Sequence, residues 1–365
     1  MRAVLLRGHG GFDRLELRDD VPVPQPQAGQ VLVKVAAAGV NNTDINTRIG
    51  WYAPDVVAAG SSSESAAPIA RDDIGWSGDV PVFPRIQGAD ACGRIVSIGP
   101  DVDAERIGER IIVEPVFRDD DDPQGRPVYF GSEVDGAFAD YTVVPSQHAV
   151  RVDCDWTDVE LASIPCSYSA AENMISRAGV SAGEMVLVTG ASGGVGSAAV
   201  QLAKRRGARV IAIAAPAKHD EVAALGADVV LPRGGDLTAA LGRKSVDVVI
   251  DVVGGPIWSQ LLDVLRPRGR YATSGAIGGP WVELDLRMLY LNDLTLFGCT
   301  VLDAHIFGNL VQYIERGEIK PIVAATFPLS EIVAAQQLFL TKQHVGKIVL
   351  TVGAALSSKT LAGLI

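Results

Sequence analysis

The sequence predicts a two-domain α/β protein in which a doubly wound parallel sheet stands beside a β-rich domain. Three observations lead to this fold class. Residues Glu184–Gly207 read as a short apolar strand, a turn of Gly, Ala and Ser, and a helix rich in Ala and Leu. After this stretch, strand-like and helix-like segments alternate, as in parallel sheets with helical crossovers. Before it, short strands separated by Gly, Pro and Asp recur, as in barrels and sandwiches.

Composition limits the classes of function. The chain has 365 residues, of which 48% are hydrophobic, enough for two sizeable cores. A formal net charge of −11 argues against nucleic acid as a partner and against a basic membrane-binding surface. We find no apolar run long enough for a membrane span and no signal-peptide pattern. The four cysteines form no C-x-x-C pair, so we expect reduced thiols and a cytoplasmic protein.

The first domain is expected to be built from short strands. Val31–Val35 alternates apolar and polar residues with the period of a half-buried strand. Further strands are expected at Met1–Leu6, Arg94–Ile98, Arg110–Val113 and Ala139–Val144. Their spacing predicts a partly closed barrel or a sandwich.

Two segments interrupt this pattern. Pro54–Pro81 has no periodicity and is expected to be a long loop that shapes the substrate pocket. Arg118–Arg126 carries four consecutive aspartates but lacks the spaced ligands and central Gly of a calcium loop. A solvated acidic loop is therefore expected there.

The glycine turn carries the signature of a dinucleotide site. Ala191, Gly193 and Gly196 occupy the three small-residue positions of the G-x-G-x-x-G pattern. Small residues let the backbone approach a pyrophosphate, and the following helix directs its N-terminal N–H groups at the anion. We expect the cofactor to contact the whole turn, which comprises Ala191, Ser192, Gly193, Gly194, Val195 and Gly196. The alternative is a tight turn in another kind of α/β protein.

The region after this turn predicts a Rossmann-type, doubly wound sheet. The expected strands are Met185–Thr189, Ala208–Ala214, Asp228–Leu231, Val246–Val252, Gly269–Ser274 and Thr295–Val301. The expected helices between them are His219–Leu225, Pro256–Leu265 and Val282–Leu291. Such alternation places successive strands parallel to one another.

Several further motifs follow one another along the chain. Gly39–Tyr52 reads GVNNTDINTRIGWY, Gln87–Gly99 reads QGADACGRIVSIG, Asp247–Gly254 reads DVVIDVVG and Gly346–Leu350 reads GKIVL. Together with the glycine turn, they resemble the medium-chain dehydrogenase/reductase superfamily, and in particular its zinc-independent quinone oxidoreductase and enoyl reductase branch. The resemblance implies a GroES-like catalytic domain, residues 1–166 with 303–365, and a Rossmann domain, residues 167–302.

The resemblance also bears on metal binding. Zinc alcohol dehydrogenases of the superfamily bind their catalytic zinc through a Cys, a His-Glu pair and a second Cys or an Asp. The matching residues here are Asn41, Ala89 with Asp90, and Cys166. An amide and an alanine cannot replace two zinc donors, so we expect no metal. Cys166 is then a small, buried side chain, although a degenerate site of Asp44, Asp90 and Cys166 stays open as an alternative.

The expected cofactor is NADP(H). The second Rossmann strand ends at Ile213–Pro216 without the acidic residue that would bind the ribose hydroxyls of NAD. Lys218 matches a lysine that contacts the 2′-phosphate in NADPH-preferring relatives. A solvated lysine at a helix start is the alternative. Ser274, at the end of a later strand, is expected to contact the cofactor too.

Three residues of the Gly39–Tyr52 segment are the catalytic candidates. Tyr52 matches the tyrosine that donates a proton in enoyl reductases. Asn41 is expected to orient the nicotinamide or bind the substrate carbonyl, and Asp44 to order the loop between them. The alternatives are that Tyr52 or Trp51 merely lines the pocket, that Asn41 caps backbone groups and that Asp44 forms a turn.

These residues predict an NADPH-dependent reductase that transfers hydride to a quinone or an α,β-unsaturated carbonyl without zinc. The alternatives are an alcohol or aldehyde dehydrogenase with an altered metal site, and a nucleotide-binding protein without catalysis. The expected partners are a small-molecule substrate and further copies of the chain, as a homodimer or homotetramer. Thr295–Val301 is an apolar strand expected at the sheet edge, where an open edge favours such pairing.

Overall fold

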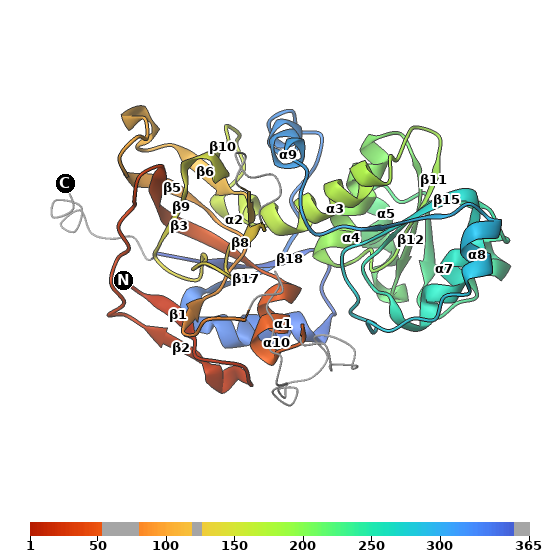
Figure 1. Ribbon diagram of the computed structural model, residues 1–365, viewed down its shortest axis with the longest axis horizontal. Helices are drawn as coiled ribbons and strands as arrows, with labels where there is room; N and C mark the ends of the chain where they lie inside the picture. Colours follow the sequence, from red (N-terminus) through yellow and green to blue (C-terminus); the bar gives the residue numbers. More distant parts are fainter. Residues whose placement is uncertain (53–79, 119–125, 354–365) are drawn as a thin grey trace.

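The computed structural model describes residues 1–52, 80–118 and 126–353. The greater parts of the two expected loops, residues 53–79 and 119–125, lie outside these ranges, as do residues 354–365. Figure 1 shows two lobes that each contain a sheet, with helices between them. None of the helices in the described ranges is long and apolar enough to cross a lipid bilayer.

The first lobe is organised around strand β3 (Gln30–Val40). It lies in a seven-stranded sheet of order β10-β6-β5-β3-β18-β17, and β9 also pairs with β3. Smaller sheets of order β2-β1-β4 and β7-β8 adjoin it. The strands of this lobe are β1 (Ala3–Leu6), β2 (Leu15–Arg18), β4 (Arg85–Ile86), β5 (Cys92–Ile98), β6 (Arg110–Val113), β7 (Val116–Phe117), β8 (Val128–Tyr129), β9 (Tyr141–Pro145), β10 (Ala149–Arg151), β17 (Val323–Pro328) and β18 (Lys347–Thr351).

Strand β18 returns the end of the chain to this sheet. It pairs antiparallel with β3, with Ile348 opposite Val40, and parallel with β17. The closing GKIVL motif thus forms a strand of the N-terminal sheet. Residues Lys347–Leu350 of this strand are buried.

The second lobe is the predicted doubly wound parallel sheet. Its order is β13-β12-β11-β14-β15-β16, and every neighbouring pair is parallel. Its strands are β11 (Met185–Val188), β12 (Arg209–Ala214), β13 (Val229–Pro232), β14 (Val246–Asp251), β15 (Leu265–Thr273) and β16 (Thr295–Gly298). Its helices are α4 (Gly194–Arg205), α5 (His219–Ala224), α6 (Leu237–Leu241), α7 (Trp258–Val264) and α8 (Leu286–Leu291). Leu265 begins a strand rather than ending a helix, because it pairs with Val246.

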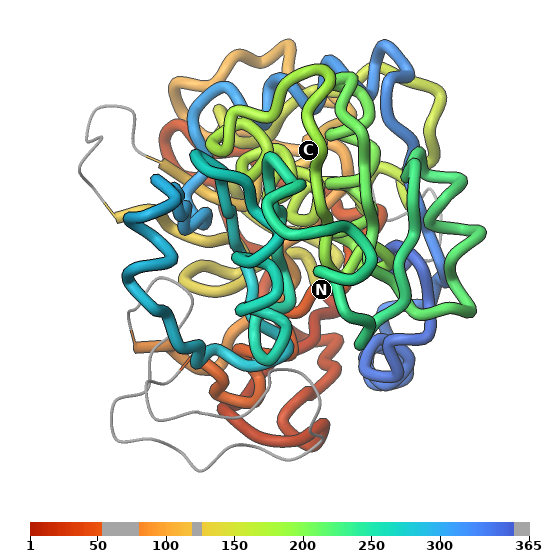
Figure 2. Tube along the Cα trace, turned by 90° about the vertical axis from the view of Figure 1, so that its right-hand side faces the viewer, coloured from red at the N-terminus to blue at the C-terminus, as the bar shows by residue number. Residues whose placement is uncertain are grey.

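The remaining helices lie between or beside the sheets: α1 (Asn42–Ile49), α2 (Asp158–Leu161), α3 (Pro165–Arg177), α9 (His305–Glu315) and α10 (Ile332–Thr341). A capping box opens α2, with reciprocal bonds between Thr157 and Glu160. One hydrophobic core includes Cys92 of the first sheet, Met174 of α3 and Val188 of β11. Figure 2, seen from the side of the second lobe, shows that lobe in front of the N-terminal strands. The two lobes therefore share buried packing, while their boundaries at 166/167 and 302/303 stay a prediction.

Candidate active site

The glycine turn joins β11 to α4 in the way that an anion-binding turn requires. Gly193 precedes the first residue of α4, and the helix begins at Gly194. A Cβ on Gly196 would lie 2.2 Å from the carbonyl oxygen of Gly190, so no larger residue fits where the helix crosses the strand. A Cβ on Gly194 would lie 2.6 Å from the Ser167 hydroxyl oxygen. The turn therefore presents bare backbone and helical N–H groups, which fits a dinucleotide pyrophosphate.

The residues predicted for this turn do not all face a cavity. Ser192 lines a first cavity of about 370 Å³, and Gly193 lines both this cavity and a second one of about 400 Å³. Gly194, Val195 and Gly196 line the second cavity. Ala191 is fully buried and packs in the core beneath the turn. Its small side chain serves packing, whereas its neighbours are available to a ligand.

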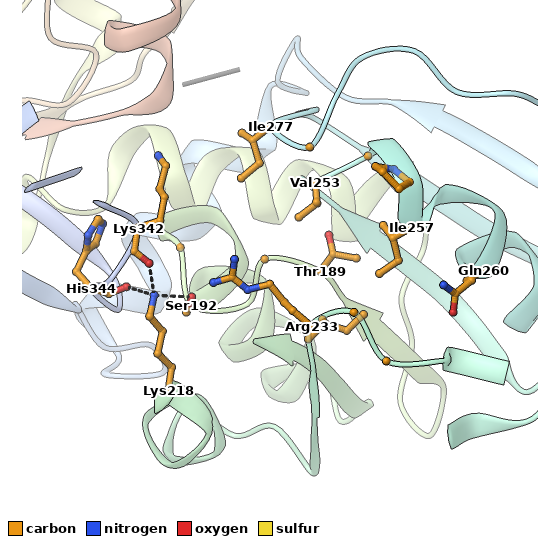
Figure 3. A pocket seen from close by; sticks show the side chains of 18 residues that line it. Thr189, Ser192, Lys218, Arg233, Val253, Ile257, Gln260, Ile277, Lys342 and His344 are labelled. Atoms are coloured by element: carbon orange, nitrogen blue, oxygen red, sulfur yellow. Dashed lines mark hydrogen bonds between the residues drawn. The ribbon is translucent and has the colours of Figure 1, made fainter. Parts of the chain in front are cut away.

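The first cavity lies at the carboxyl ends of β11, β12 and β14, and it gathers positive charge. Lys218, Arg233 and Lys342 line it, and its described lining contains no Asp or Glu (Figure 3). Sequence reasoning does not single out Arg233 or Lys342. Arg233 directly follows β13, the strand beside β12. Its position at the carboxyl end of a strand could have marked it in the sequence as a candidate cofactor contact. Lys342 follows α10, far along the chain, and has no local signal.

Lys218 reaches into this cavity but is held by the protein. Its Nζ donates to the carbonyl oxygens of Lys342 and His344, each at 2.7 Å, and to the Ser192 hydroxyl at 3.3 Å (Figure 3). Burial, with a contribution from the charge of Arg233, lowers the pKa of Lys218. Lys218 thus fastens the segment after α10 to the glycine turn. Its contact with a 2′-phosphate stays a prediction.

The second cavity brings together most of the other predicted residues. Asn41, Tyr52, Cys166 and Ser274 line it, although they come from three separate segments. Trp51 lines it as well, and the rings of Trp51 and Tyr52 meet edge to face with centroids 5.4 Å apart. Because the cavity continues past the glycine turn, a cofactor on that turn would extend into it.

Asp44 lies outside both cavity linings. It is buried at the start of α1, and its carboxylate accepts a hydrogen bond from the backbone N–H of Asn41 at 2.7 Å. Gln87 donates to the Asp44 carbonyl oxygen at 2.9 Å. Burial raises the pKa of the Asp44 carboxyl to about 7. The structure therefore places Asp44 as a helix-capping residue under the cavity rather than as a ligand contact.

A buried ammonium group forms part of the second cavity wall. Lys347 is 3% exposed, and its Nζ donates to the Val40 carbonyl at 3.1 Å, to Asp90 Oδ2 at 2.7 Å and to Asn41 Oδ1. Asp90 Oδ2 also accepts from Asn41 Nδ2 at 2.8 Å, and Asp90 Oδ1 accepts from the Cys166 backbone N–H at 2.6 Å. The side-chain amide of Asn41 thus forms hydrogen bonds through both its oxygen and its nitrogen. The GKIVL motif did not indicate this role for Lys347.

The contacts of Asn41 and Asp90 with Lys347 also show whether these residues could bind a metal ion. Two of the residues that match zinc ligands of the alcohol dehydrogenases, Asn41 and Asp90, bond to an ammonium ion. Burial, together with the charge of Asp90, raises the pKa of the Cys166 thiol and disfavours the thiolate that zinc requires. Across residues 1–52, 80–118 and 126–353, no three His, Cys, Asp or Glu side chains group as a metal site. The donor set does not fit zinc.

Tyr52 contributes a phenol hydroxyl to the wall of the second cavity. Burial raises the pKa of its phenol, whereas hydrogen bonds from the Asn46 and Thr43 side chains act in the opposite direction. The phenol is therefore neutral at physiological pH and able to donate a proton to a bound acceptor.

Comparison with known proteins agrees with this geometry. A family model described as zinc-binding dehydrogenase matches residues 194–316, and one described as alcohol dehydrogenase GroES-like domain matches residues 27–154. The chain is 28% identical to acryloyl-coenzyme A reductase of Metallosphaera sedula, over 96% of this chain and 100% of that protein. It is 27% identical to the quinone oxidoreductase of Rattus norvegicus, over 96% and 97% of the two chains.

A solved structure from Sinorhizobium meliloti 1021, described provisionally as an alcohol dehydrogenase, has a TM-score of 0.87 and 47% identity over 96% of both chains. These similarities extend over both lobes and include the glycine turn. The first lobe is accordingly GroES-like and the second Rossmann-like. The chain belongs to the medium-chain dehydrogenase/reductase superfamily, a family of oxidoreductases that bind a nicotinamide cofactor.

Proposed function

We propose that the chain is an NADPH-dependent, zinc-independent reductase of quinones or α,β-unsaturated carbonyl compounds. One observation carries the proposal: the glycine turn and the neutral phenol of Tyr52 border the same cavity. This arrangement puts a proton donor beside the place where the nicotinamide end of a bound cofactor would lie. The names of two relatives, a quinone oxidoreductase and an acryloyl-coenzyme A reductase, support the same class of acceptor.

The preference for NADPH rests on the charges of the first cavity. Arg233 and Lys342 join Lys218 there, and the described lining has no carboxylate to bind the ribose hydroxyls or repel a phosphate. The Lys218 donors are engaged by protein oxygens, so Arg233 is the better candidate for direct phosphate contact. Guanidinium groups bind phosphate through two parallel hydrogen bonds.

The chemistry of the second cavity suits conjugate reduction. When bound, NADPH supplies the hydride. The protein has to hold the acceptor, exclude water and deliver a proton to the enolate that the acceptor becomes. Tyr52 is placed for the proton, while Lys347 and Asp90 fix the wall against which the acceptor packs. Quinones need less acid assistance, since their reduced oxygens are protonated readily by solvent.

The proposal is tested by NADPH consumption, in the presence of a metal chelator, with matched quinones, enones and enoyl thioesters. Primary and secondary alcohols with NADP⁺ are assayed in parallel. We expect turnover of the conjugated acceptors, unchanged by the chelator, and a lower KM for NADPH than for NADH. Tight NADPH binding without turnover of any acceptor would instead support the non-catalytic alternative.

A second candidate is an alcohol dehydrogenase with an altered metal site. It is favoured by the position of Cys166 in the cavity wall and by the alcohol dehydrogenase description of the structure from S. meliloti. Alcohol oxidation that the chelator abolishes, with one equivalent of tightly bound zinc per chain, would establish this candidate and exclude the zinc-independent one.

A further inference from the structure

Helix α1 turns a polar face towards the second cavity. Asn42, Thr43 and Asn46 all line it. Positions 42 and 46 are four residues apart and positions 43 and 46 are three apart, so these side chains share one face of the helix. The amides nearby are engaged: Asn41 binds Lys347 and Asp90, and Asn42 Oδ1 accepts from Lys342 Nζ at 3.0 Å.

Asn46 differs from these amides. It is 6% exposed, and its Oδ1 has no hydrogen-bond partner in the described part of the chain. Burying an acceptor without a partner costs stability, so an apolar side chain of similar size would suit the fold better. Buried polar groups left in this state are uncommon in native proteins and often belong to functional sites. Stability therefore does not explain why an amide occupies this position.

The other end of the Asn46 side chain faces Tyr52. Asn46 and Thr43 both hydrogen-bond to the Tyr52 side chain, and both bonds favour the phenolate over the phenol. A phenol oxygen that accepts these bonds has its own O–H left for another acceptor. The same bonds stabilise the negative oxygen that remains once the proton has left.

We propose that Asn46 is a positioning residue for proton transfer by Tyr52, holding the phenol oxygen so that its O–H is directed at the bound acceptor. The inference rests on the proposed function. Hydride from NADPH forms a C–H bond at the conjugated carbon, and the electron pair of the alkene moves into an enolate. The Tyr52 O–H bond then breaks, a C–H bond forms at the α-carbon, and solvent water returns a proton to the phenolate.

The test combines two substitutions, Asn46→Leu and Tyr52→Phe, singly and together. Leu has the same branching and the same number of heavy atoms as Asn, although it is bulkier, and it cannot hydrogen-bond. We expect Asn46→Leu to lower kcat for an enone by about tenfold, the loss of one good hydrogen bond, with the KM for NADPH and the rate with a quinone nearly unchanged. The solvent deuterium isotope effect on enone reduction should rise, because the proton step becomes slower. In the Tyr52→Phe background, Asn46→Leu should add nothing.

Two further measurements separate positioning from structure. The melting temperature of Asn46→Leu should be no lower than that of the natural protein, since the substitution removes an unpaired buried acceptor. Asn46→His, which retains an N–H donor, should recover part of the enone rate. Thr47→Val is the matched control: Thr47 is buried on the same helix but does not line the cavity, and its substitution should leave enone turnover unaffected.

The outcomes also distinguish the inference from the function on which it rests. If Tyr52→Phe leaves enone reduction unchanged, the proton-donor role of Tyr52 fails, and the role of Asn46 fails with it. If Tyr52→Phe slows the reaction but Asn46→Leu does not, only the role of Asn46 is wrong. Equal losses with enone and quinone, or an undiminished effect of Asn46→Leu in the Tyr52→Phe background, would likewise overturn it.

Discussion

At the scale of single residues, Arg233 is the side chain on which we expect the proposed preference for NADPH to depend most. It lies at the first cavity and is exposed, and its guanidinium makes no hydrogen bond or ion pair within the described ranges. Lys218, by contrast, is 6% exposed and bonds to protein oxygens. A free guanidinium can bind a 2′-phosphate without first breaking an existing contact.

Arg233→Ala is therefore expected to raise the KM for NADPH by about tenfold, the effect of losing one charge-assisted contact, while the KM for NADH stays nearly constant. Steady-state kinetics with both cofactors provide the measurement. Arg243→Ala, which removes an exposed arginine outside the cavities, controls for net charge. Equal changes in both KM values would show that Arg233 does not contact the phosphate.

Lys342 is expected to make cofactor binding depend on pH. Burial, reinforced by the charge of Lys218, lowers the pKa of Lys342 to about 7. A phosphate bound nearby favours the charged amine and raises this pKa, so at about pH 8 binding should take up a proton and weaken as the pH rises further. Calorimetry in buffers of different ionisation enthalpy measures the uptake. Proton uptake that persists undiminished in Lys342→Met would refute the assignment.

At the scale of elements, the closing strand does more than complete a sheet. Lys347 of β18 connects β3, the start of α3 and the wall of the second cavity through Asn41 and Asp90. Both charges of the pair are almost fully buried. A buried ion pair usually stabilises a fold no more than a well-packed apolar pair in the same place would. Removing only one partner, however, leaves the other charge buried and uncompensated, which lowers stability.

Lys347→Met alone should therefore lower the free energy of unfolding by about 3–5 kcal/mol, and addition of Asp90→Asn should restore most of it. Urea unfolding of the two variants gives the comparison. If the double variant is also slow with enones while NADPH binding is normal, the pair shapes the acceptor pocket. A double variant less stable than the single one would show that the ion pair itself supports the fold.

The elements also show what the sequence can predict. The glycine turn and the alternation after it identify β11, α4 and the parallel sheet, because their signals are local. Asn41, Tyr52 and the glycine turn line one cavity in the structure, while their roles stay predictions. Lys342 and Lys347 could not be assigned in this way, because their roles depend on contacts between segments up to 307 residues apart. Arg233 did offer a local signal, since it directly follows β13. Asp44 matches a motif, yet the structure places its carboxylate on backbone rather than at a ligand.

At the scale of the whole molecule, we propose that copies of the chain associate through the free edge of the parallel sheet. Strand β16 is the last strand of that sheet among the described residues, as predicted for this segment. The neighbouring side chains of Trp281, Leu286, Tyr290 and Leu291 are 62–70% exposed. Exposed apolar side chains and an open sheet edge both favour self-association, and Figure 1 shows α8 at the far end of the second lobe.

The chain is accordingly expected to elute as a dimer or tetramer, and Leu286→Glu with Leu291→Glu to shift it towards monomer, because buried charges oppose the contact. Size-exclusion chromatography with light scattering measures the mass. Leu17→Glu, at an exposed leucine of β2, is the control. A natural protein that is monomeric at micromolar concentration would contradict this interface.

In the proposed reaction of the whole molecule, hydride reaches the conjugated carbon of an acceptor and the protein supplies the proton. The most direct test is reduction of an enone with NADPH deuterated at the transferred position, followed by mass spectrometry and NMR of the product. We predict a saturated ketone with deuterium at the β-carbon and a solvent-derived proton at the α-carbon. Deuterium on the carbonyl carbon of an allylic alcohol would contradict the account and indicate carbonyl reduction of the alcohol dehydrogenase type.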